Sequence, residues 1–213
     1  TCTLVSGSTY TLQNLLRGRF GTEWAMGLHE FGDTIVALNT SDVTAIGMSS
    51  SSIGLSRAYR AITYDQDISS DSDRDFTYRG VNLECLSPVH CRGALVSLST
   101  DWEVTAVRRS RTDGEWRDYV DVGLGEYSEA YELDIFSNNT YSTLKRTLSS
   151  ATPSFLYTTA QQITDFGVTQ NFLYAKMYQL SSTVGRGYPA VLSLSSGLND
   201  PYWSFVSLLM PMT

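Results

Sequence analysis

The stretch that decides the fold is WEVTAVRR, from Trp102 to Arg109. It places Trp102, Val104 and Ala106 on one face of an extended chain and Glu103 and Thr105 on the other. This period of two is typical of a strand with one buried face. The stretch therefore predicts a half-buried β-strand with Trp102 in a core.

Two further segments alternate in the same way, YELDIF over 131–136 and FLYAKMYQL over 172–180. Turn-forming residues separate all three, such as Asp113 and Gly114. The full set of strands predicted around them is 89–97, 102–110, 130–136, 142–147, 155–158, 173–180 and 190–194. Seven short strands with turns between them indicate an immunoglobulin-like β-sandwich, with a helical turn over 159–167.

We expect an all-β chain in three parts. A small β module occupies 1–83, a sandwich occupies 84–196 and a C-terminal tail occupies 197–213. The module begins with a hairpin that turns at Ser6, Gly7 and Ser8. Apolar runs predict buried strands over 33–38 and 43–48, and further strands are expected over 56–64 and 76–80.

The composition narrows the classes of function. The 213 residues carry a formal net charge of −7, which disfavours binding to nucleic acid or to anionic lipid. No apolar run approaches the ~20 residues that a membrane helix needs, so we expect no membrane insertion. Aromatic residues make up 12% of the chain; Trp24, Trp102, Trp116 and Trp203 suit core and interface packing, with a sugar-binding platform as the alternative.

Cysteine, histidine and acidic residues give weak signals for chemistry. Cys2, Cys85 and Cys91 lack a metal-binding spacing and are expected to be reduced thiols, and two histidines are too few for a zinc centre. Asp71, Asp73 and Asp75 have the spacing of the first three ligands in a calcium-binding loop, but Phe76 occupies the position where such a loop has glycine. We therefore predict no metal and no cofactor, and interpret 65–75 as a solvated acidic loop.

Carboxylates and arginines face each other around the centre of the chain. Glu126 and Glu132 allow the hypothesis of a cell-wall glycosidase, which needs a pair of carboxyl groups. Cross-strand ion pairs with Arg108, Arg111 and their neighbours explain the same residues without catalysis. We favour the ion pairs and predict that the protein is not an enzyme.

Six short sequence segments, called phrases below, occur in one order along the chain, and together they resemble a known family. They are LLRGRFGTEWA at 15–25, YRAIT at 59–63, SPVHCRG at 87–93, RRSRTDGEWRD at 108–118, GLGEYSEAYELDI at 123–135 and YQLSSTVGRG at 178–187. Over roughly 9–190 the chain resembles the C-terminal part of the tail-tip hub, or host-specificity, protein of siphophages and gene transfer agents. Where these relatives commonly carry a core tryptophan, this chain has Ala106, and Trp102 on the same face is expected to fill that space.

The resemblance implies a fibronectin type III-like sandwich and a structural role in the virion. It implies assembly in the bacterial cytoplasm as a homotrimer with tail-tube and tail-tip proteins, and contact with a host receptor or glycan. The alternative is direct receptor binding through the loops at 113–127 and 137–141. Our interface candidates are Arg17, Arg19, Glu23, Trp116, Arg117, Arg186, Tyr202 and Trp203; the last two lie in an apolar tail that we expect to be docked.

Overall fold

The computed structural model describes residues 1–196 except 40, 42, 45 and 113–117. The chain divides into two compact units, Thr1–Ser49 and Ser50–Thr213, which are taken one at a time below. The predicted boundary between 83 and 84 falls inside the second unit, just before its sandwich, and stays a prediction.

The first unit begins with an antiparallel hairpin. Strands β1 (Cys2–Ser6) and β2 (Thr9–Leu12) pair across a turn at Gly7, whose φ of 52° lies in the left-handed region that glycine tolerates. Two short 3₁₀ helices follow, η1 (Arg19–Gly21) and η2 (Glu23–Ala25). The predicted hairpin is confirmed.

The predicted strands at 33–38 and 43–48 are wrong. Residues 33–39 lie outside any strand, and so do the described residues of 43–48. Ile35 and Leu38 are exposed rather than buried. An apolar run forms a strand only where a neighbouring strand accepts its backbone hydrogen bonds, and within residues 1–49 the described strands β1 and β2 pair with each other.

The second unit opens with an irregular segment and a hairpin. Its elements are η3 (Ser50–Ser52), β3 (Ser56–Tyr59), η4 (Ile68–Ser70), β4 (Arg74–Thr77) and η5 (Val81–Leu83). Strands β3 and β4 pair antiparallel, and the rings of Tyr59 and Phe76 meet edge to face at 6.5 Å. The strands are shorter and shifted compared with the predicted 56–64 and 76–80.

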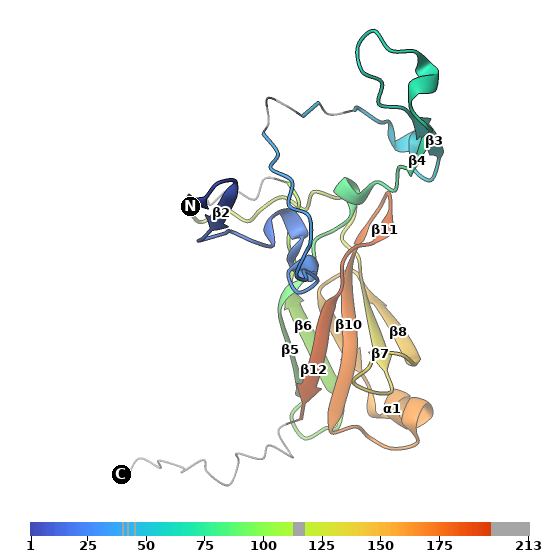
Figure 1. The fold of residues 1–213 in the computed structure, drawn as a ribbon. Coiled ribbons are helices and arrows are strands. Elements are labelled where there is room, and N and C mark those ends of the chain that lie inside the picture. The colour runs from blue at the N-terminus through green and yellow to red at the C-terminus, as the bar shows by residue number, and fades with distance from the viewer. Residues whose placement is uncertain (40, 42, 45, 113–117, 197–213) are drawn as a thin grey trace. The chain divides into compact units, whose positions relative to one another are not determined.

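The sandwich consists of two antiparallel sheets (Figure 1). One contains β5 (Val89–Leu95), β6 (Trp102–Val107) and β9 (Ser154–Tyr157), in the order β5-β6-β9. The other contains β7 (Tyr131–Phe136), β8 (Leu144–Ser150), β10 (Phe172–Ser181), β11 (Gly185–Arg186) and β12 (Ala190–Ser195). In it β10 pairs with β7 on one side and with β11 and β12 on the other, and β8 pairs with β7. The predicted all-β, sandwich-like fold is confirmed.

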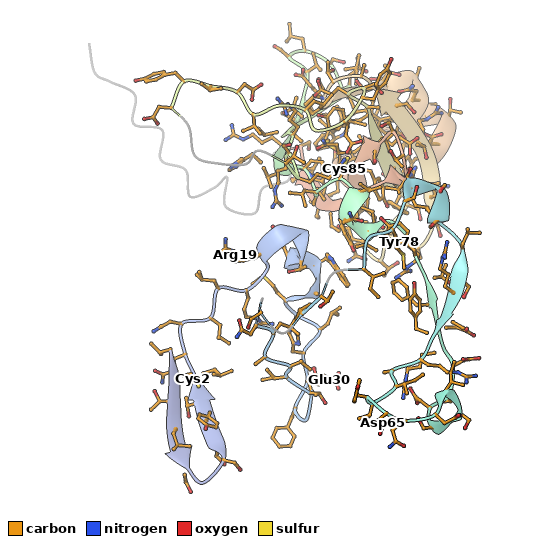
Figure 2. All side chains as sticks on the ribbon, turned by 90° about the horizontal axis from the view of Figure 1, so that it is seen from above. Cys2, Arg19, Glu30, Asp65, Tyr78 and Cys85 are labelled. Atoms are coloured by element: carbon orange, nitrogen blue, oxygen red, sulfur yellow. The ribbon has the colours of Figure 1, made fainter. Side chains whose placement is uncertain are left out.

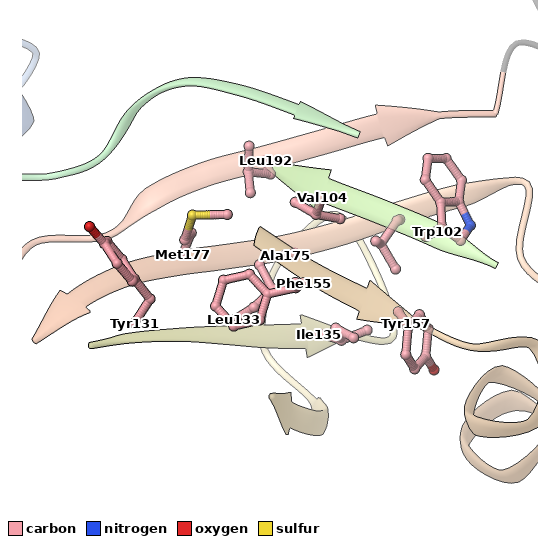
Figure 3. Packing of buried hydrophobic residues seen from close by; sticks show 11 residues of the cluster. Trp102, Val104, Tyr131, Leu133, Ile135, Phe155, Tyr157, Ala175, Met177 and Leu192 are labelled. Carbon is pink, nitrogen blue, oxygen red and sulfur yellow. The ribbon is translucent and has the colours of Figure 1, made fainter. Parts of the chain in front are cut away.

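The core lies between these sheets (Figure 3). Trp102 and Val104 of β6 are fully buried, as are Leu133 of β7 and Met177 of β10. The indole Nε1 of Trp102 donates a hydrogen bond of 3.0 Å to the carbonyl oxygen of Gln170, so the polar end of this buried ring is satisfied. The predicted core face of the strand at 102–107 is confirmed.

Helix α1 (Thr159–Phe166) covers one end of the sandwich (Figure 1). Thr158 caps it, since its hydroxyl accepts the backbone N–H of Gln161 while the Gln161 side chain accepts the N–H of Thr158. Gly167 ends the helix with a φ of 79°. The helical turn predicted over 159–167 is confirmed, and local capping residues set where the helix starts and ends.

Strand register defines the two ends of the sandwich. Tyr131 of β7 lies opposite Gln179 of β10, and Phe136 lies opposite Tyr174. One end, which we call the loop end, thus carries the β6–β7 connection at 108–130 and the turn after β10. The other, the helix end, carries α1 and the β7–β8 turn at 137–143. Residues 80–85 pack at the loop end, where the backbone N–H of Tyr188 donates to the carbonyl of Cys85 at 3.2 Å.

Candidate interaction sites

The first candidate surface is the turn at Arg17–Gly18–Arg19 in the first unit. Arg17 donates from Nη2 to the carbonyl oxygen of Met26. Gly18 has a φ of 67°, in the left-handed region that favours glycine, and a Cβ there would lie 3.3 Å from the Cα of Glu23. Arg17 therefore holds the turn against residue 26.

Arg19 and Glu23 lie on the same turn and are exposed, as is Arg17. The hydroxyl of Thr22 donates to the carbonyl of Arg19 at 2.8 Å, which fixes the backbone between the two short helices. Arg19, labelled in Figure 2, and its neighbours Arg17 and Glu23 are thus three exposed charged residues within one short segment, 17–23. Their role in an interface stays a prediction.

The second candidate surface is the outer face of the β7–β10 pair, where Arg186 lies. Its Nη1 and Nη2 donate to the two carboxylate oxygens of Asp134 at 2.7 and 3.0 Å, and its Nε donates to Glu132 at 2.5 Å. Its guanidinium carbon lies 4.5 Å from the centre of the Tyr178 ring. Arg186, predicted as an interface residue, is engaged within its own chain.

Asp134 is the buried member of this group, with 3% of its surface exposed. The hydroxyl of Thr147 donates to it at 2.6 Å, from the neighbouring strand β8. The hydrogen bond with Asp134 raises the pKa of Arg186, and burial, followed by the charge of Asp134, raises the pKa of Tyr178. The carboxylate therefore ties β8, β7 and β11 together across the sheet face.

Lys176 occupies the same face, closer to the helix end. Its ammonium lies 5.2 Å from the centre of the Phe136 ring and 5.4 Å from that of Tyr141. Tyr141 has a φ of 52°, and its hydroxyl donates to the carbonyl of Leu192 at 3.1 Å. The β7–β8 turn is thereby held across the outer face of the sheet.

The long β6–β7 connection at the loop end is held at its base by two arginines. Arg108 donates to the carboxylate of Asp121 at 2.8 Å and to the carbonyl of Val122 at 2.5 Å. Arg111 donates to Glu126 at 2.9 Å and to the carbonyl of Gly125 at 3.2 Å. The outgoing leg of this connection therefore binds its returning leg.

Glu126 links this connection to the turn after β10. Its second oxygen accepts the hydroxyl of Ser181 at 3.1 Å and the backbone N–H of Ser182 at 3.2 Å. Burial favours a raised pKa for Glu126, but the hydrogen bonds from Arg111 and Ser181 outweigh it, so the pKa lies below its ordinary value. A glycosidase acid needs a raised pKa; Glu126 instead has the properties of an anchoring carboxylate.

Aromatic side chains stand out on the same connection. Tyr119 and Tyr127 are fully exposed, at 107% and 95%, and Tyr119 also has a φ of 60°. Because the register places 137–141 at the opposite end, the two loops predicted to bind a receptor do not form one surface. Of the four tryptophans, Trp102 is fully buried in the core and therefore cannot contribute to an exposed sugar-binding platform, whereas Trp24 is 55% exposed.

Four interface candidates lie outside the described residues: Trp116, Arg117, Tyr202 and Trp203. The acidic loop is described. There Asp71 accepts the backbone N–H groups of Ala61 and Ser72, and Asp73 pairs with Arg60. No group of three metal-binding side chains occurs in the part of the chain that the structure describes, so the aspartates act as caps and ion pairs in this loop.

The cysteines are free thiols. Burial, followed by the charge of Glu126, raises the pKa of Cys85 to about 12, so this thiol is not a reactive nucleophile. Within the described residues no helix is long and apolar enough to span a membrane.

Comparison with known proteins gives limited matches. Residues 1–36 match the family described as "Rcc01698-like, C-terminal", and no curated protein matches the sequence. Among solved structures, the rat CD45 extracellular region, domains d3-d4, is similar at 12% identity and a TM-score of 0.35, over 92% of this chain and 93% of that one. A TM-score of this size does not establish a shared fold, so the fold rests on the strand pairing described above.

Proposed function

We propose that this chain is a structural component of a phage or phage-like tail tip, a hub or baseplate protein that displays a β-sandwich near the host cell. The order of the six phrases quoted above supports this function. The structural observation that carries it is how few residues of the first unit are buried. Of the residues at 1–49 whose burial the structure describes, Gly21 alone is buried, whereas Leu16, Phe31, Ile35 and Leu38 are largely exposed.

A unit of this kind gains little stability from its own core. Folding requires apolar burial to offset a conformational entropy cost of roughly 1–2 kcal/mol per residue. Below about 40 residues a domain usually needs a disulfide, a metal or a partner; residues 1–49 are only slightly longer, and the cysteine in this unit, Cys2, is free and exposed. Residues 1–49 therefore suit an assembly element that acquires its core from what it binds.

The sandwich fits the role of a displayed domain. Its order β5-β6-β9 in one sheet and β8-β7-β10-β12 in the other supports the finer assignment to the fibronectin type III type. Glu126 and Glu132 are both held by arginines, which supports a non-catalytic role. In this proposal the chain assembles as a homotrimer with tail-tube and tail-tip proteins, in the bacterial cytoplasm, and remains in the virion.

Cryo-electron microscopy of intact particles, with mass spectrometry of their proteins, tests this function. We expect the chain at the tail tip with threefold neighbours and with residues 1–49 in contact with another protein. Its absence from particles, or a cell-wall activity of the free chain that is lost in Glu126→Gln, would contradict the proposal.

Direct receptor binding is the second candidate, favoured by the β6–β7 connection. A rigid base with exposed tyrosines resembles the way binding loops are presented on stable scaffolds. The double variant Tyr119→Ser with Tyr127→Ser should then reduce adsorption of particles to host cells without changing particle yield. Unchanged adsorption would contradict receptor binding through these tyrosines, and the sandwich would then act only as a structural spacer.

A further inference from the structure

The hairpin β1–β2 has one apolar and one polar face. Cys2 lies opposite Leu12 and Leu4 lies opposite Tyr10, so these four side chains share a face, while Thr3 and Thr11 pair on the other. Leu4, Tyr10 and Leu12 are 55%, 59% and 40% exposed. The pattern is that of a sheet that packs on a core, and within residues 1–49 this apolar face is uncovered.

The backbone of the same residues points outward along the hairpin edges. Thr1 and Gln13 exchange both backbone hydrogen bonds, at 2.7 and 2.9 Å. Bonded and non-bonded pairs alternate in an antiparallel ladder, so Thr3–Thr11 is the next bonded pair and Leu4–Tyr10 is a non-bonded pair. The N–H and C=O groups of Leu4 and Tyr10 therefore face away from the partner strand, toward whatever lies beside the hairpin.

The two edges lack protecting charges and prolines, and they differ in regularity, because the register of β1 shifts between Leu4 and Ser6. Edge strands in monomeric proteins are commonly blocked by lysine, proline or inward-pointing charges. Residues 1–16, TCTLVSGSTYTLQNLL, contain no charged residue and no proline. The regular edge of β2 is thus the one that best fits the addition of a further strand.

A second copy of the hairpin does not satisfy this surface. Two hairpins joined edge to edge extend the apolar face and leave it uncovered. Two hairpins packed face to face bury only the exposed parts of four side chains each, on the order of 300 Å² per copy. A stable interface buries about 800 Å² per partner, so the area favours a larger sheet that already has its own apolar layer.

We propose that β1–β2 joins an open-edged β-sheet of a neighbouring protein by strand addition, with Leu4, Tyr10 and Leu12 placed on that sheet's apolar layer. This inference rests on the proposed function, because the neighbour is a protein of the assembled tail tip. The main-chain hydrogen bonds supply attachment, and the alternation of apolar and threonine side chains sets which face turns inward.

Hydrogen exchange with mass spectrometry tests the inference on the full chain, free and in purified particles. In the free chain at low concentration, we expect the amides of Leu4 and Tyr10 to exchange rapidly. In particles, we expect exchange in the peptide at 1–13 to slow by at least a hundredfold at the amide on the joined edge, which is Tyr10 if β2 is joined and Leu4 if β1 is joined. Slowing confined to Thr3 and Thr11 would overturn strand addition, since those amides bond within the hairpin already.

A pair of variants supplies the second measurement. Leu4→Thr with Tyr10→Thr keeps strand propensity but removes the apolar face, and should lower incorporation of the chain into particles at least tenfold. Thr3→Ser with Thr11→Ser is the matched control on the opposite face and should incorporate normally. The unfolding midpoint of the sandwich should be the same in both, which separates a lost contact from a misfolded protein.

The remaining outcomes are also decisive. Protection of the hairpin amides in the monomeric free chain would show that the chain covers its own hairpin, and protection that grows with concentration would show a second copy; either overturns the inference. If the sandwich peptides are found in particles but the hairpin exchanges freely, the inference fails and the proposed function stands. If no peptide of the chain is found in particles, both fail.

Discussion

Asp134 and Arg186 lie 52 residues apart in the sequence and meet through two hydrogen bonds of 2.7 and 3.0 Å on the outer face of the sandwich. Asp134 comes from a central strand, and Arg186 from the short strand β11 beyond β10. The pair therefore fixes the turn after β10 to the body of the sheet. Since Glu126 binds Ser181 and Ser182 in the same turn, two carboxylates hold the loop end from different sides.

Removal of Arg186 should destabilise the sandwich. In Arg186→Ala the nearly buried carboxylate of Asp134 retains Thr147 as a partner but loses its cation, at a cost of roughly 2–3 kcal/mol, which allows for the partial exposure of the arginine. Urea unfolding of the full chain measures this. The double variant with Asp134→Asn should recover part of the loss; equal destabilisation in the single and double variants would show that the ion pair is not the cause.

Stability should depend on pH through Glu126. Its pKa in the folded state lies below the ordinary value of 4.5, so the folded protein binds this proton less readily than the unfolded chain does. The resulting stabilisation is complete above about pH 4.5 and is lost as pH falls through the folded-state pKa. Glu126→Gln should thus be less stable than the parent at pH 7, and the difference should shrink in acid. Glu103→Gln, at an exposed position on β6, is the control, and a loss of stability at pH 7 equal to that of Glu126→Gln would contradict the role given to Glu126.

Arg108 should control the order of the β6–β7 connection rather than the stability of the core. Arg108→Ala removes the bonds to Asp121, Val122 and Gly123, and we expect limited proteolysis near 118–123 to become several-fold faster. The unfolding midpoint should change little, because the core residues lie elsewhere. Arg92→Ala, an exposed arginine on β5, is the control, and equal cleavage rates in the two variants would contradict this role.

Gly187 should tolerate no side chain. A Cβ there would lie 2.2 Å from the carbonyl oxygen of Cys85 and 2.8 Å from its carbon, and backbone atoms cannot move aside as a side chain can. Gly187→Ala should cost roughly 1–3 kcal/mol or more through overpacking, as measured by thermal unfolding. Gly123→Ala meets nothing within 4 Å and should be close to neutral; the same loss in both variants would count against the steric explanation.

Much of the sandwich could be predicted from the sequence because its central strands carry their own pattern. The alternation around Trp102, Leu133 and Met177 reports which face is buried, whichever strand lies next to it. Helix α1 was recoverable for a similar reason, since Thr158 and Gly167 are local start and stop signals. In the first hairpin, Gly7 indicated the position of the turn, where its φ is positive in the structure.

Long-range pairs could not be predicted in the same way. Nothing near Arg186 in the sequence identifies Asp134 or Thr147 as its neighbours, and the partners of Arg108 depend on how a loop returns. Gln162 is fully buried and bonds to Thr100 and Gln170, although its position in the sequence is that of an ordinary helical residue. The apolar run at 33–38 misled because periodicity reports a buried face but not whether a neighbouring strand exists to pair with it.

The direction of two strands has a mechanical consequence. Strand β5 runs from the loop end to the helix end, and β12 runs the same way, from Ala190 opposite Met177 to Ser195 opposite Phe172. A pull between the start of β5 and the end of β12 therefore acts along the strands and not across them. The six residue pairs of the β10–β12 ladder would be sheared together instead of opening one after another, so the sandwich would transmit tension as a stiff link between whatever is attached at its two ends.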